Sequence, residues 1–506
     1  MTATTHPDAA RIEWWLAHQA QAQPHKEALV LGTERLTFGD LAQRVERVAQ
    51  ALTARGVTPG ERVAIFLDKT VDAVAAFYAI WRAGAVAVPI HDALKSAQVK
   101  HILDDSGSVV VLSDDKMVSR LDPGTFGSAT LFDLKTVWAS PADAAVPEVL
   151  AGGREPAVIL YTSGSTGRPK GILIAHDNLV AGARIVAKYL QITDADRILS
   201  VLPFSFDYGL NQLLTSVRQG ATLVLQRSHH PADLCASLIN ERITGLAGVP
   251  PFWIQLMQRQ SPFSTKAFPA LRYITNSGGD FPSDLVDRYR AHLPHVQVIL
   301  MYGLSEAFRS TYLTFAEIDR HRGSIGRAIP ETEIFVVADD GQRCAPGEIG
   351  QLVHMGPTVA LGYYNDEAKT AAVFRPHPFD PNSTQRAVYS GDLVRSDDEG
   401  YLWFVGRRDV MIKSHGFRIS PEEVEEQVHR SGLVAAVIAH GEPDPVAGQH
   451  VIVDVVPRYK DTFTTGALFA WSRREMPRYM MPHEILVHDE LPRTLSGKFD
   501  RKRVSS

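Results

Sequence analysis

The segment YTSGSTGRPKG, residues 161–171, combines glycines, hydroxyl side chains and a lysine in one short stretch. Gly164 and Gly167 permit backbone conformations that are closed to other residues, so successive N–H groups can converge on an anion. Lys170 adds a positive charge, and further hydroxyl donors come from Thr162, Ser163, Ser165 and Thr166. The spacing is not the Walker pattern. A polyphosphate-binding loop and a flexible Gly/Ser surface loop are both compatible with this composition.

Outward from this segment, short apolar runs alternate with helical patterns over most of the chain. Strands are predicted at residues 63–67, 86–90, 109–112, 222–225 and 296–301. Between the first two, apolar residues at 71, 74, 77, 78 and 81 share one helical face, which Gly84 ends. This alternation predicts an α/β fold in which helices cover largely parallel or mixed sheets.

A domain boundary is predicted near residues 405–409, within FVGRRDVMIKSHGFRISPEEVEE. About 400 residues precede it, more than a single core usually holds. The remainder has its own cycle of strands at 434–439, 451–456 and 485–487 and a helix around 466–474. A helix after Ser420 starts with a capping box, with Pro421 in its first position. We therefore expect a large domain over residues 1–408 and a small α+β domain over residues 409–506.

Composition excludes several classes of protein. The chain has 506 residues, 45% of them hydrophobic, which argues against disorder. The formal net charge of −5 argues against nucleic-acid binding through a basic surface. Its two cysteines, Cys235 and Cys344, cannot form a disulfide framework and fit a reducing compartment. Because the N-terminus does not resemble a secretory signal and no apolar run approaches ~20 residues, we expect a soluble cytoplasmic protein without membrane insertion.

The segment at 161–171 closely resembles the phosphate loop of the AMP-forming adenylating enzymes, which include acyl- and aryl-CoA ligases, nonribosomal peptide adenylation domains and firefly luciferase. Further segments resemble motifs of this family in order along almost the whole chain: LTFGDL at 36–41, RAGAVAVP at 82–89, YGLSE at 302–306, SIGR at 324–327, YSGDL at 389–393, GRRD at 406–409, the segment 413–419 and PRTLSGK at 492–498. Ser305 and Ser390 stand where the family usually has threonine, and both keep the hydroxyl. The resemblance implies a large N-terminal domain with a β-subdomain and a mobile C-terminal domain.

The resemblance also implies that the chain binds ATP and Mg²⁺. It assigns the metal to Glu306, and a carboxylate suits a Mg²⁺ ion that also contacts substrate phosphates. Asp392 and Arg407 would bind the ribose, and Tyr302, Gly278 and Gly279 would border the adenine. The remaining nucleotide contacts implied are Thr162, Ser163, Gly164, Ser165, Thr166, Gly167, Lys170, Gly303, Ser305 and Lys498. Of these, Lys498, Glu306 and Lys170 are the residues predicted to act in catalysis.

Lys498 matches the lysine that bridges carboxylate and phosphate oxygens during adenylation. Taken alone, a lysine in a basic tail would be ordinary solvated surface. Asp409 matches the hinge about which the small domain swings, withdrawing Lys498 and bringing residues 413–419 to the site for thioester formation. His415 in that segment is a weak candidate for a general base, because the matching family position is variable.

The acid pocket is expected at the positions that match the specificity sites of peptide adenylation domains. They are Phe206, Asp207, Tyr208, Asn211, Gly248, Asn276, Gly278, Met301, Arg309 and Ser310. Asp207 lies in an apolar run, where a buried carboxylate needs a cation or donors. The α-ammonium of an amino acid would supply the cation; Arg309 or backbone N–H groups are the alternatives. The polar lining fits a long aliphatic chain badly.

The predicted activity is that of an ATP-dependent acid–thiol ligase that forms acyl-AMP and then a thioester. The leading substrate is a small or polar amino acid, transferred to the phosphopantetheine thiol of a free-standing carrier protein. The alternative is an acyl- or aryl-CoA ligase that uses free CoA, with Asp207 paired to Arg309. A catalytically silent relative that only binds nucleotide or acyl-adenylate is disfavoured, because Lys170, Glu306, Asp392, Arg407 and Lys498 are all present.

Overall fold

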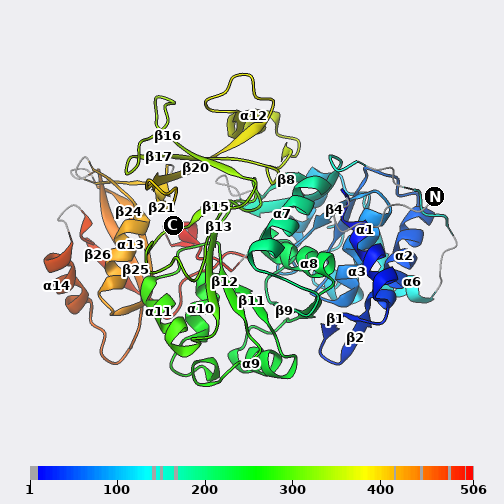
Figure 1. The fold of residues 1–506 in the computed structure, drawn as a ribbon, viewed down its shortest axis with the longest axis horizontal. Helices are drawn as coiled ribbons and strands as arrows, with labels where there is room; N and C mark the ends of the chain where they lie inside the picture. The colour runs from blue at the N-terminus through cyan, green and yellow to red at the C-terminus, as the bar shows by residue number, and fades with distance from the viewer. Residues whose placement is uncertain are drawn as a thin grey trace.

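A computed structural model gives the structure of residues 10–139, 144–148, 152–163, 169–408, 410–414, 417–444, 448–476, 480–495 and 497–504. These residues form an α/β fold with a large N-terminal domain, a β-subdomain and a small C-terminal domain, so the predicted fold class is confirmed. Figure 1 shows the first strands and helices at one end of the molecule and the last ones at the other, with the β-subdomain above their junction.

The first sheet has the strand order β18-β8-β7-β4-β3-β5-β6. Its strands are β3 (Arg62–Ile65), β4 (Val86–Pro89), β5 (Val110–Ser113), β6 (Thr130–Asp133), β7 (Pro156–Ser163), β8 (Pro169–Ala175) and β18 (Gly362–Tyr363). Strands β3 to β7 pair in parallel, whereas β8 pairs antiparallel with both β7 and β18. Residues 161–171 therefore include the end of β7 and the start of β8, which pair with each other.

The second sheet has the order β15-β14-β13-β12-β11-β9-β10-β1-β2. Its strands are β1 (Glu27–Leu31), β2 (Glu34–Thr37), β9 (Arg197–Ser200), β10 (Thr222–Leu225), β11 (Gly245–Gly248), β12 (Tyr273–Asn276), β13 (Gln297–Tyr302), β14 (Thr311–Leu313) and β15 (Arg327–Ala328). Its central strands are parallel, and both edges end in antiparallel pairs.

Helices cover both sheets. They are α1 (Glu13–Ala22), α2 (Phe38–Ala54), α3 (Val71–Arg82), α4 (Ser96–Ser106), α5 (Asp115–Val118), α6 (Leu134–Ala139), α7 (His176–Tyr189), α8 (Asp207–Gln219), α9 (Pro231–Asn240), α10 (Pro250–Leu256), the 3₁₀ turn η1 (Pro262–Thr265) and α11 (Ser283–His292). The α3 helix shows how the sequence determines these helices. Thr70 caps its first turn, its apolar face is buried, and Gly84 follows it at φ +74°. Helices α7 and α8 pack against each other, α7 against β8 and α8 against β9 and β10, so this pair joins the two sheets.

The β-subdomain is an antiparallel sheet. Its strands are β16 (Glu333–Val337), β17 (Ile349–Met355), β19 (Phe374–Pro376), β20 (Arg386–Ser396) and β21 (Leu402–Arg407), and the short helix α12 (Glu367–Val373) lies beside them. Figure 1 shows this sheet bridging the two ends of the molecule.

The small domain has its own sheet and its own apolar core. Its elements are β22 (Ile412–Ser414), β23 (Phe417–Ile419), α13 (Pro421–Arg430), β24 (Val434–Asp444), β25 (Gly448–Pro457), α14 (Thr465–Glu475), β26 (Glu484–Val487) and the 3₁₀ turn η3 (Arg501–Arg503). Val424 and Val428 of α13 pack with strand residues such as Val453. Ser420 caps α13: its Oγ accepts from the Glu423 amide at 3.3 Å and donates to Glu422 Oε2. Among the described residues, no bond from the Ser420 amide to the Glu423 side chain completes the predicted capping box. The boundary between residues 408 and 409 stays a prediction.

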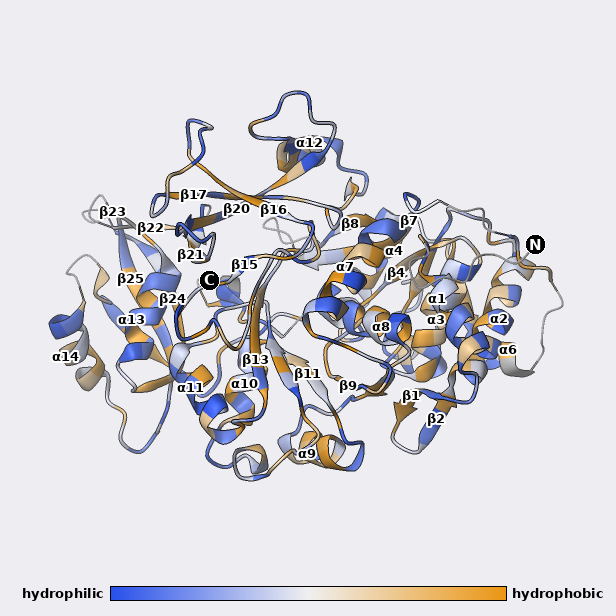
Figure 2. Ribbon diagram, in the orientation of Figure 1, coloured by the Kyte–Doolittle hydropathy of each residue, from blue (hydrophilic) through white to orange (hydrophobic). Residues whose placement is uncertain are grey.

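Figure 2 shows apolar residues on the helix faces that meet the sheets, and charged residues on the outer faces. Cys235 and Cys344 are buried and unbonded to each other. Across the described residues, we find no helix with the length and apolarity that crossing a bilayer requires.

Candidate active site

The predicted phosphate loop joins β7 to β8. In this hairpin Thr162 pairs with Lys170 and Ser163 with Pro169, which brings the ends of the loop together. The predicted ligands Gly164, Ser165, Thr166 and Gly167 lie outside the described residues. Lys170 is half-buried at the start of β8. The hairpin therefore fixes both ends of the loop and the position of its lysine.

Glu306 and Lys170 both lie near Lys369, and Tyr363 contacts Glu306. No sequence motif pointed to Tyr363 or Lys369. The hydroxyl of Tyr363, on β18, donates to Glu306 Oε1 at 2.5 Å. Lys369, on α12, places its Nζ atom 4.0 Å from the Tyr363 ring centroid. Burial and the neighbouring Lys170 ammonium lower the pKa of Lys369 to about 8. A carboxylate with two closely spaced ammonium groups suits phosphates and their counter-ion.

A single carboxylate is a typical protein contribution to a Mg²⁺ site that is completed by water and substrate phosphates. Within the described ranges, no group of three or more His, Cys, Asp or Glu side chains is arranged to hold a metal. Glu306 therefore fits a Mg²⁺ ion that arrives with a nucleotide, and its Tyr363 partner fixes the orientation of the carboxylate.

Asp392 lies on β20, opposite Arg407 of β21. Arg407 Nη1 is 2.9 Å from Asp392 Oδ1, and the Tyr302 hydroxyl donates to Oδ2 of the same carboxylate. Burial raises the pKa of Asp392 above its ordinary value. Three of the predicted nucleoside-binding residues thus meet at the junction of β13 with the β-subdomain.

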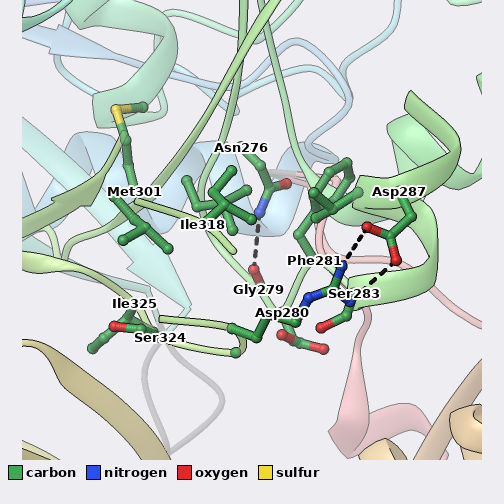
Figure 3. A pocket seen from close by; sticks show the side chains of 15 residues that line it. Asn276, Gly279, Asp280, Phe281, Ser283, Asp287, Met301, Ile318, Ser324 and Ile325 are labelled. Carbon is green, nitrogen blue, oxygen red and sulfur yellow. Dashed lines mark hydrogen bonds and ion pairs between the residues drawn. The ribbon is translucent and has the colours of Figure 1, made fainter. Parts of the chain in front are cut away.

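A cavity opens beside this junction, between α11 and β13 (Figure 3). Asn276, Gly279, Asp280, Met301 and Ile325 contribute to its lining. Asn276 donates from Nδ2 to the Gly279 carbonyl at 3.2 Å. Its buried Oδ1 atom has no hydrogen-bond partner among the described residues. The cavity therefore adjoins the Gly278-Gly279 pair that was predicted to border the adenine.

The register of β12 decides which face of the sheet Asn276 occupies. On β12 the Thr275 hydroxyl contacts the Tyr208 hydroxyl of α8, at 2.5 Å. Successive side chains of a strand point to opposite faces of a sheet. Asn276 consequently faces the α11 side and the cavity of Figure 3, rather than the α8 side on which Asp207 lies.

Lys498 of the small domain reaches into the N-terminal domain. Its Nζ atom lies 5.1 Å from the ring centroid of Phe206, and its side chain passes beside Gly278. Burial lowers the pKa of Lys498, and the carboxylates of Asp207, Asp392 and Glu306 oppose this shift. The small domain thus places a half-buried cation near both groups of predicted ligands. Asp409 and His415 lie outside the described residues.

Asp207 is paired with Arg309. Arg309 Nη1 is 3.3 Å from Asp207 Oδ2, and both side chains are almost fully buried. The same nitrogen donates to the Phe308 carbonyl at 2.6 Å, and the guanidinium lies over the Tyr208 ring at 4.7 Å. Of the alternatives for Asp207 that the sequence left open, this arrangement shows the arginine partner.

Other predicted pocket residues contact side chains outside this pair. Gly248 packs against Phe252 and Trp253, and Met301 Sδ accepts from the Tyr189 hydroxyl at 2.9 Å. Ser310 Oγ is 2.9 Å from His354 Nδ1, and His354 Nε2 is 3.2 Å from Thr358 Oγ1. No motif signalled His354, Tyr363 or Lys369. They become visible only when strands remote in sequence are brought together.

Lys498 thus reaches a nucleotide-type site from the small C-terminal domain, as the resemblance to AMP-forming acid–thiol ligases implies. Comparison with known proteins puts the chain in this class. The chain belongs to the family of AMP-binding enzymes: residues 16–364 match the AMP-binding enzyme family and residues 423–498 match the AMP-binding enzyme C-terminal domain.

The relatives are of two kinds. An indoleacetate–CoA ligase of Aromatoleum aromaticum is 32% identical, over 97% of this chain and 96% of its own length. A linear gramicidin synthase of Brevibacillus parabrevis is 30% identical over 99% of this chain, which spans only 6% of that protein. The o-succinylbenzoate CoA synthetase of Bacillus subtilis, solved with its acyl-adenylate, superposes with a TM-score of 0.87 at 28% identity, covering 97% of this chain and 98% of the other; the same enzyme has been solved with ATP and magnesium.

Proposed function

We propose that this ligase converts a carboxylic acid and ATP to acyl-AMP and pyrophosphate at the junction where Lys498 meets the N-terminal domain. In this first step the acid attacks the α-phosphate, pyrophosphate leaves, and Lys498 is the catalytic cation. The observation that carries the proposal is the position of the Lys498 side chain, which passes beside Gly278 and places Nζ 5.1 Å from the Phe206 ring centroid. Carboxylates of both predicted ligand groups act on its ammonium. A cation here neutralises charge that develops as the acid attacks the α-phosphate. Such preorganised electrostatic groups contribute on the order of 3–4 kcal/mol.

Two groups of residues near Lys498 hold the nucleotide, one at its phosphates and one at its nucleoside. Lys170, Ser305 and the described residues of the phosphate loop, Thr162 and Ser163, bind the phosphates, and Glu306 holds the Mg²⁺ ion that accompanies them. Asp392 and Arg407 bind the ribose hydroxyls. Tyr302, Gly278, Gly279 and Gly303 border the adenine. The pairing of Asp392 with Tyr302 and Arg407 supports these roles, because it fixes the carboxylate before a nucleotide binds.

The acid is proposed to be an acyl or aryl acid rather than an α-amino acid. Arg309 already neutralises Asp207, so the carboxylate does not require a substrate ammonium. The acceptor would then be the thiol of free CoA, and residues 413–419 would approach the site after the small domain turns about Asp409.

A second candidate keeps the amino acid and the carrier protein. The observation that favours it is the position of Asp207 next to Lys498, where a substrate ammonium bound to Asp207 would lie close to the reacting carboxylate. The acceptor would be the phosphopantetheine of a carrier protein, as in the nonribosomal branch of relatives. In this case Arg309 must turn away from Asp207 when the substrate enters.

ATP–pyrophosphate exchange with the purified chain distinguishes these functions. We expect exchange with members of an acyl and aryl acid panel and none with amino acids, followed by thioester formation with CoA. Exchange with an amino acid alone, abolished in Asp207→Ala, would favour the second candidate. Lys498→Ala should abolish exchange and spare thioester formation from supplied acyl-adenylate; equal loss of both would contradict the role given to Lys498. Absence of exchange with every acid would indicate the silent relative.

A further inference from the structure

Three polar side chains gather on one side of the proposed acid site. Asp207 and Asn211 are four residues apart on α8, so they share one face of the helix. Arg309 lies against this face through its contacts with Asp207 and the Tyr208 ring. All three side chains are more than nine-tenths buried. The cluster lies near Lys498, because Lys498 Nζ is 5.1 Å from the ring centroid of Phe206, the residue directly before Asp207.

The cluster has more hydrogen-bond donors than acceptors. Arg309 Nη1 is occupied by Asp207 and the Phe308 carbonyl. Arg309 Nε, Arg309 Nη2 and Asn211 Nδ2 are buried and have no partner among the described residues. Each unsatisfied buried donor costs about 1–3 kcal/mol. Three such donors beside a substrate site therefore call for acceptor atoms that the described residues do not provide.

The backbone directly before Arg309 is strained, which independently indicates a functional role for Arg309. Phe308 has φ +59°, a conformation that is rare for a bulky residue. The Arg309 amide donates to the Ala307 carbonyl at 2.6 Å, closing a tight three-residue turn around Phe308. Strained backbone of this kind costs about 1–3 kcal/mol and concentrates at functional sites.

Packing keeps this strained turn from relaxing. The Phe308 ring is fully buried against Gly182 of α7, where an added methyl group would lie 2.5 Å from the ring. Gly182 thus provides the space that lets Phe308 sit under the turn. The following residue, Arg309, is directed toward α8 as a result.

We infer that Arg309 and Asn211 bind a second, oxygen-bearing group of the acid substrate, so that the ligase selects carboxylic acids with a hydroxyl, oxo or similar neutral acceptor a few bonds from the reacting carboxylate. This inference rests on the proposed function. A neutral acceptor fits better than a second carboxylate, because Asp207 already balances the charge of Arg309 and a further buried charge would be uncompensated.

Matched pairs of acids test the inference by ATP–pyrophosphate exchange on the full chain. Phenylacetate is compared with its ring-hydroxylated forms, butyrate with 3-hydroxybutyrate and 3-oxobutyrate, and each with a dicarboxylate of equal length. We expect kcat/KM to be higher for an oxygenated acid than for its unsubstituted partner by about 100-fold or more, since a site built for such hydrogen bonds rejects analogues that lack them. The dicarboxylate should have a lower kcat/KM than the oxygenated acids with which it is compared.

Two variants locate this selectivity. Asn211→Leu removes one donor at similar volume and should reduce the ratio between oxygenated and unsubstituted acids by about 10-fold or more. Gly182→Ala displaces the Phe308 ring and should reduce the same ratio through Arg309, which keeps the test decisive if one variant fails to fold. Thr215→Val is the matched control: Thr215 is buried one turn further along α8 and bonds only to backbone carbonyls. The ratio of kcat/KM between oxygenated and unsubstituted acids should be the same in Thr215→Val as in the unsubstituted protein.

The opposing outcomes are equally specific. Equal kcat/KM within every matched pair would overturn the inference while leaving the ligase function intact, and would mean that water satisfies the three donors. A preference that survives both Asn211→Leu and Gly182→Ala would also overturn it, by placing the selectivity elsewhere. Absence of exchange with every acid would instead contradict the proposed function, and the inference with it.

Discussion

The side chain of Lys498 crosses directly over Gly278. A methyl group added to Gly278 would lie 2.6 Å from Lys498 Cε, closer than real Cβ contacts occur. Gly278 also has φ +85°, which side-chain-bearing residues rarely adopt. The glycine therefore serves both the backbone turn after β12 and the passage of the lysine from the other domain.

Gly278→Ala should consequently impair adenylation more than thioester formation. In the adenylation arrangement the new methyl group collides with Lys498, whereas in thioester formation we expect the lysine to be withdrawn. The rate of acyl-AMP formation should fall about 10-fold or more, in proportion to a clash of about 1–3 kcal/mol. Single-turnover assays of each half-reaction measure the difference.

Gly341→Ala provides the control for backbone strain. Gly341 has the same φ of +85°, and nothing lies within 4 Å of an added methyl group. This variant should lose stability without changing the balance between the half-reactions. If both alanine variants alter catalysis to the same extent, the contact between Gly278 and Lys498 is not responsible.

Sequence reasoning recovered the large-scale fold because buried strands and helices carry strong local patterns. The apolar run at 222–225 coincides with β10, and the helical face from residue 71 coincides with α3. Apolar residues that become buried and glycines at the ends specify such elements, and both can be identified from the sequence alone. The small domain was predictable for the same reason.

The site was less predictable because its decisive contacts join distant segments. Asp207 and Arg309 are 102 residues apart, and only the structure resolves which of the expected partners Asp207 takes. Asn276, expected in the acid pocket, lines the cavity between α11 and β13, while Thr275 contacts Tyr208 of α8. Tyr363 and Lys369 belong to a short strand and a short helix whose local sequences carry no signal for their contact with Glu306.

Lys369→Met should weaken the binding of MgATP. The Lys369 ammonium lies beside that of Lys170, and two like charges in contact are stabilised when an anion binds between them. We expect KM for ATP to rise about 10-fold, within the range for loss of one charge-assisted hydrogen bond, while KM for the acid stays constant. Lys100→Met, which removes an exposed lysine paired with Asp104, should leave both values unchanged. A change in KM for the acid alone would place Lys369 outside the phosphate site.

His354 should make the protein sensitive to acid. Burial lowers the pKa of His354 to about 3, against about 6.5 in an unfolded chain. Between these values the unfolded chain binds a proton that the folded chain does not, so stability is complete above pH 6.5 and decreases as the pH falls toward 3. At pH 5 the loss amounts to about 2 kcal/mol.

Chemical denaturation between pH 5 and 8 tests this dependence. His354→Asn should show a flatter pH profile of the free energy of unfolding, although its stability at pH 8 is lower because the bonds to Ser310 and Thr358 change. His230→Asn is the control, since His230 is an exposed helix cap and asparagine also caps helices well. A parallel shift of the His354→Asn profile, with unchanged slope, would show that His354 does not titrate on unfolding.

The ion pair between Arg458 and Asp284 should favour adenylation. It joins the small domain to α11 at a distance of 2.7 Å, in the arrangement that places Lys498 at the site. Both side chains are partly exposed, so the pair stabilises this arrangement by only about 0.2–1 kcal/mol. Arg458→Gln and Asp284→Asn should each slow acyl-AMP formation by about 2–5-fold and leave thioester formation from supplied adenylate unaffected.

A double-mutant cycle decides whether the two residues act together. Since either substitution removes the same interaction, the double variant should be no slower than the single ones, which gives a coupling energy of about 0.2–1 kcal/mol. The matched control is Lys460 with Asp489, a 2.6 Å pair that lies wholly within the small domain. Lys460→Gln and Asp489→Asn should change neither half-reaction. Additive losses in the Arg458 and Asp284 cycle, or equal losses in both half-reactions, would show that the pair does not select the adenylation arrangement.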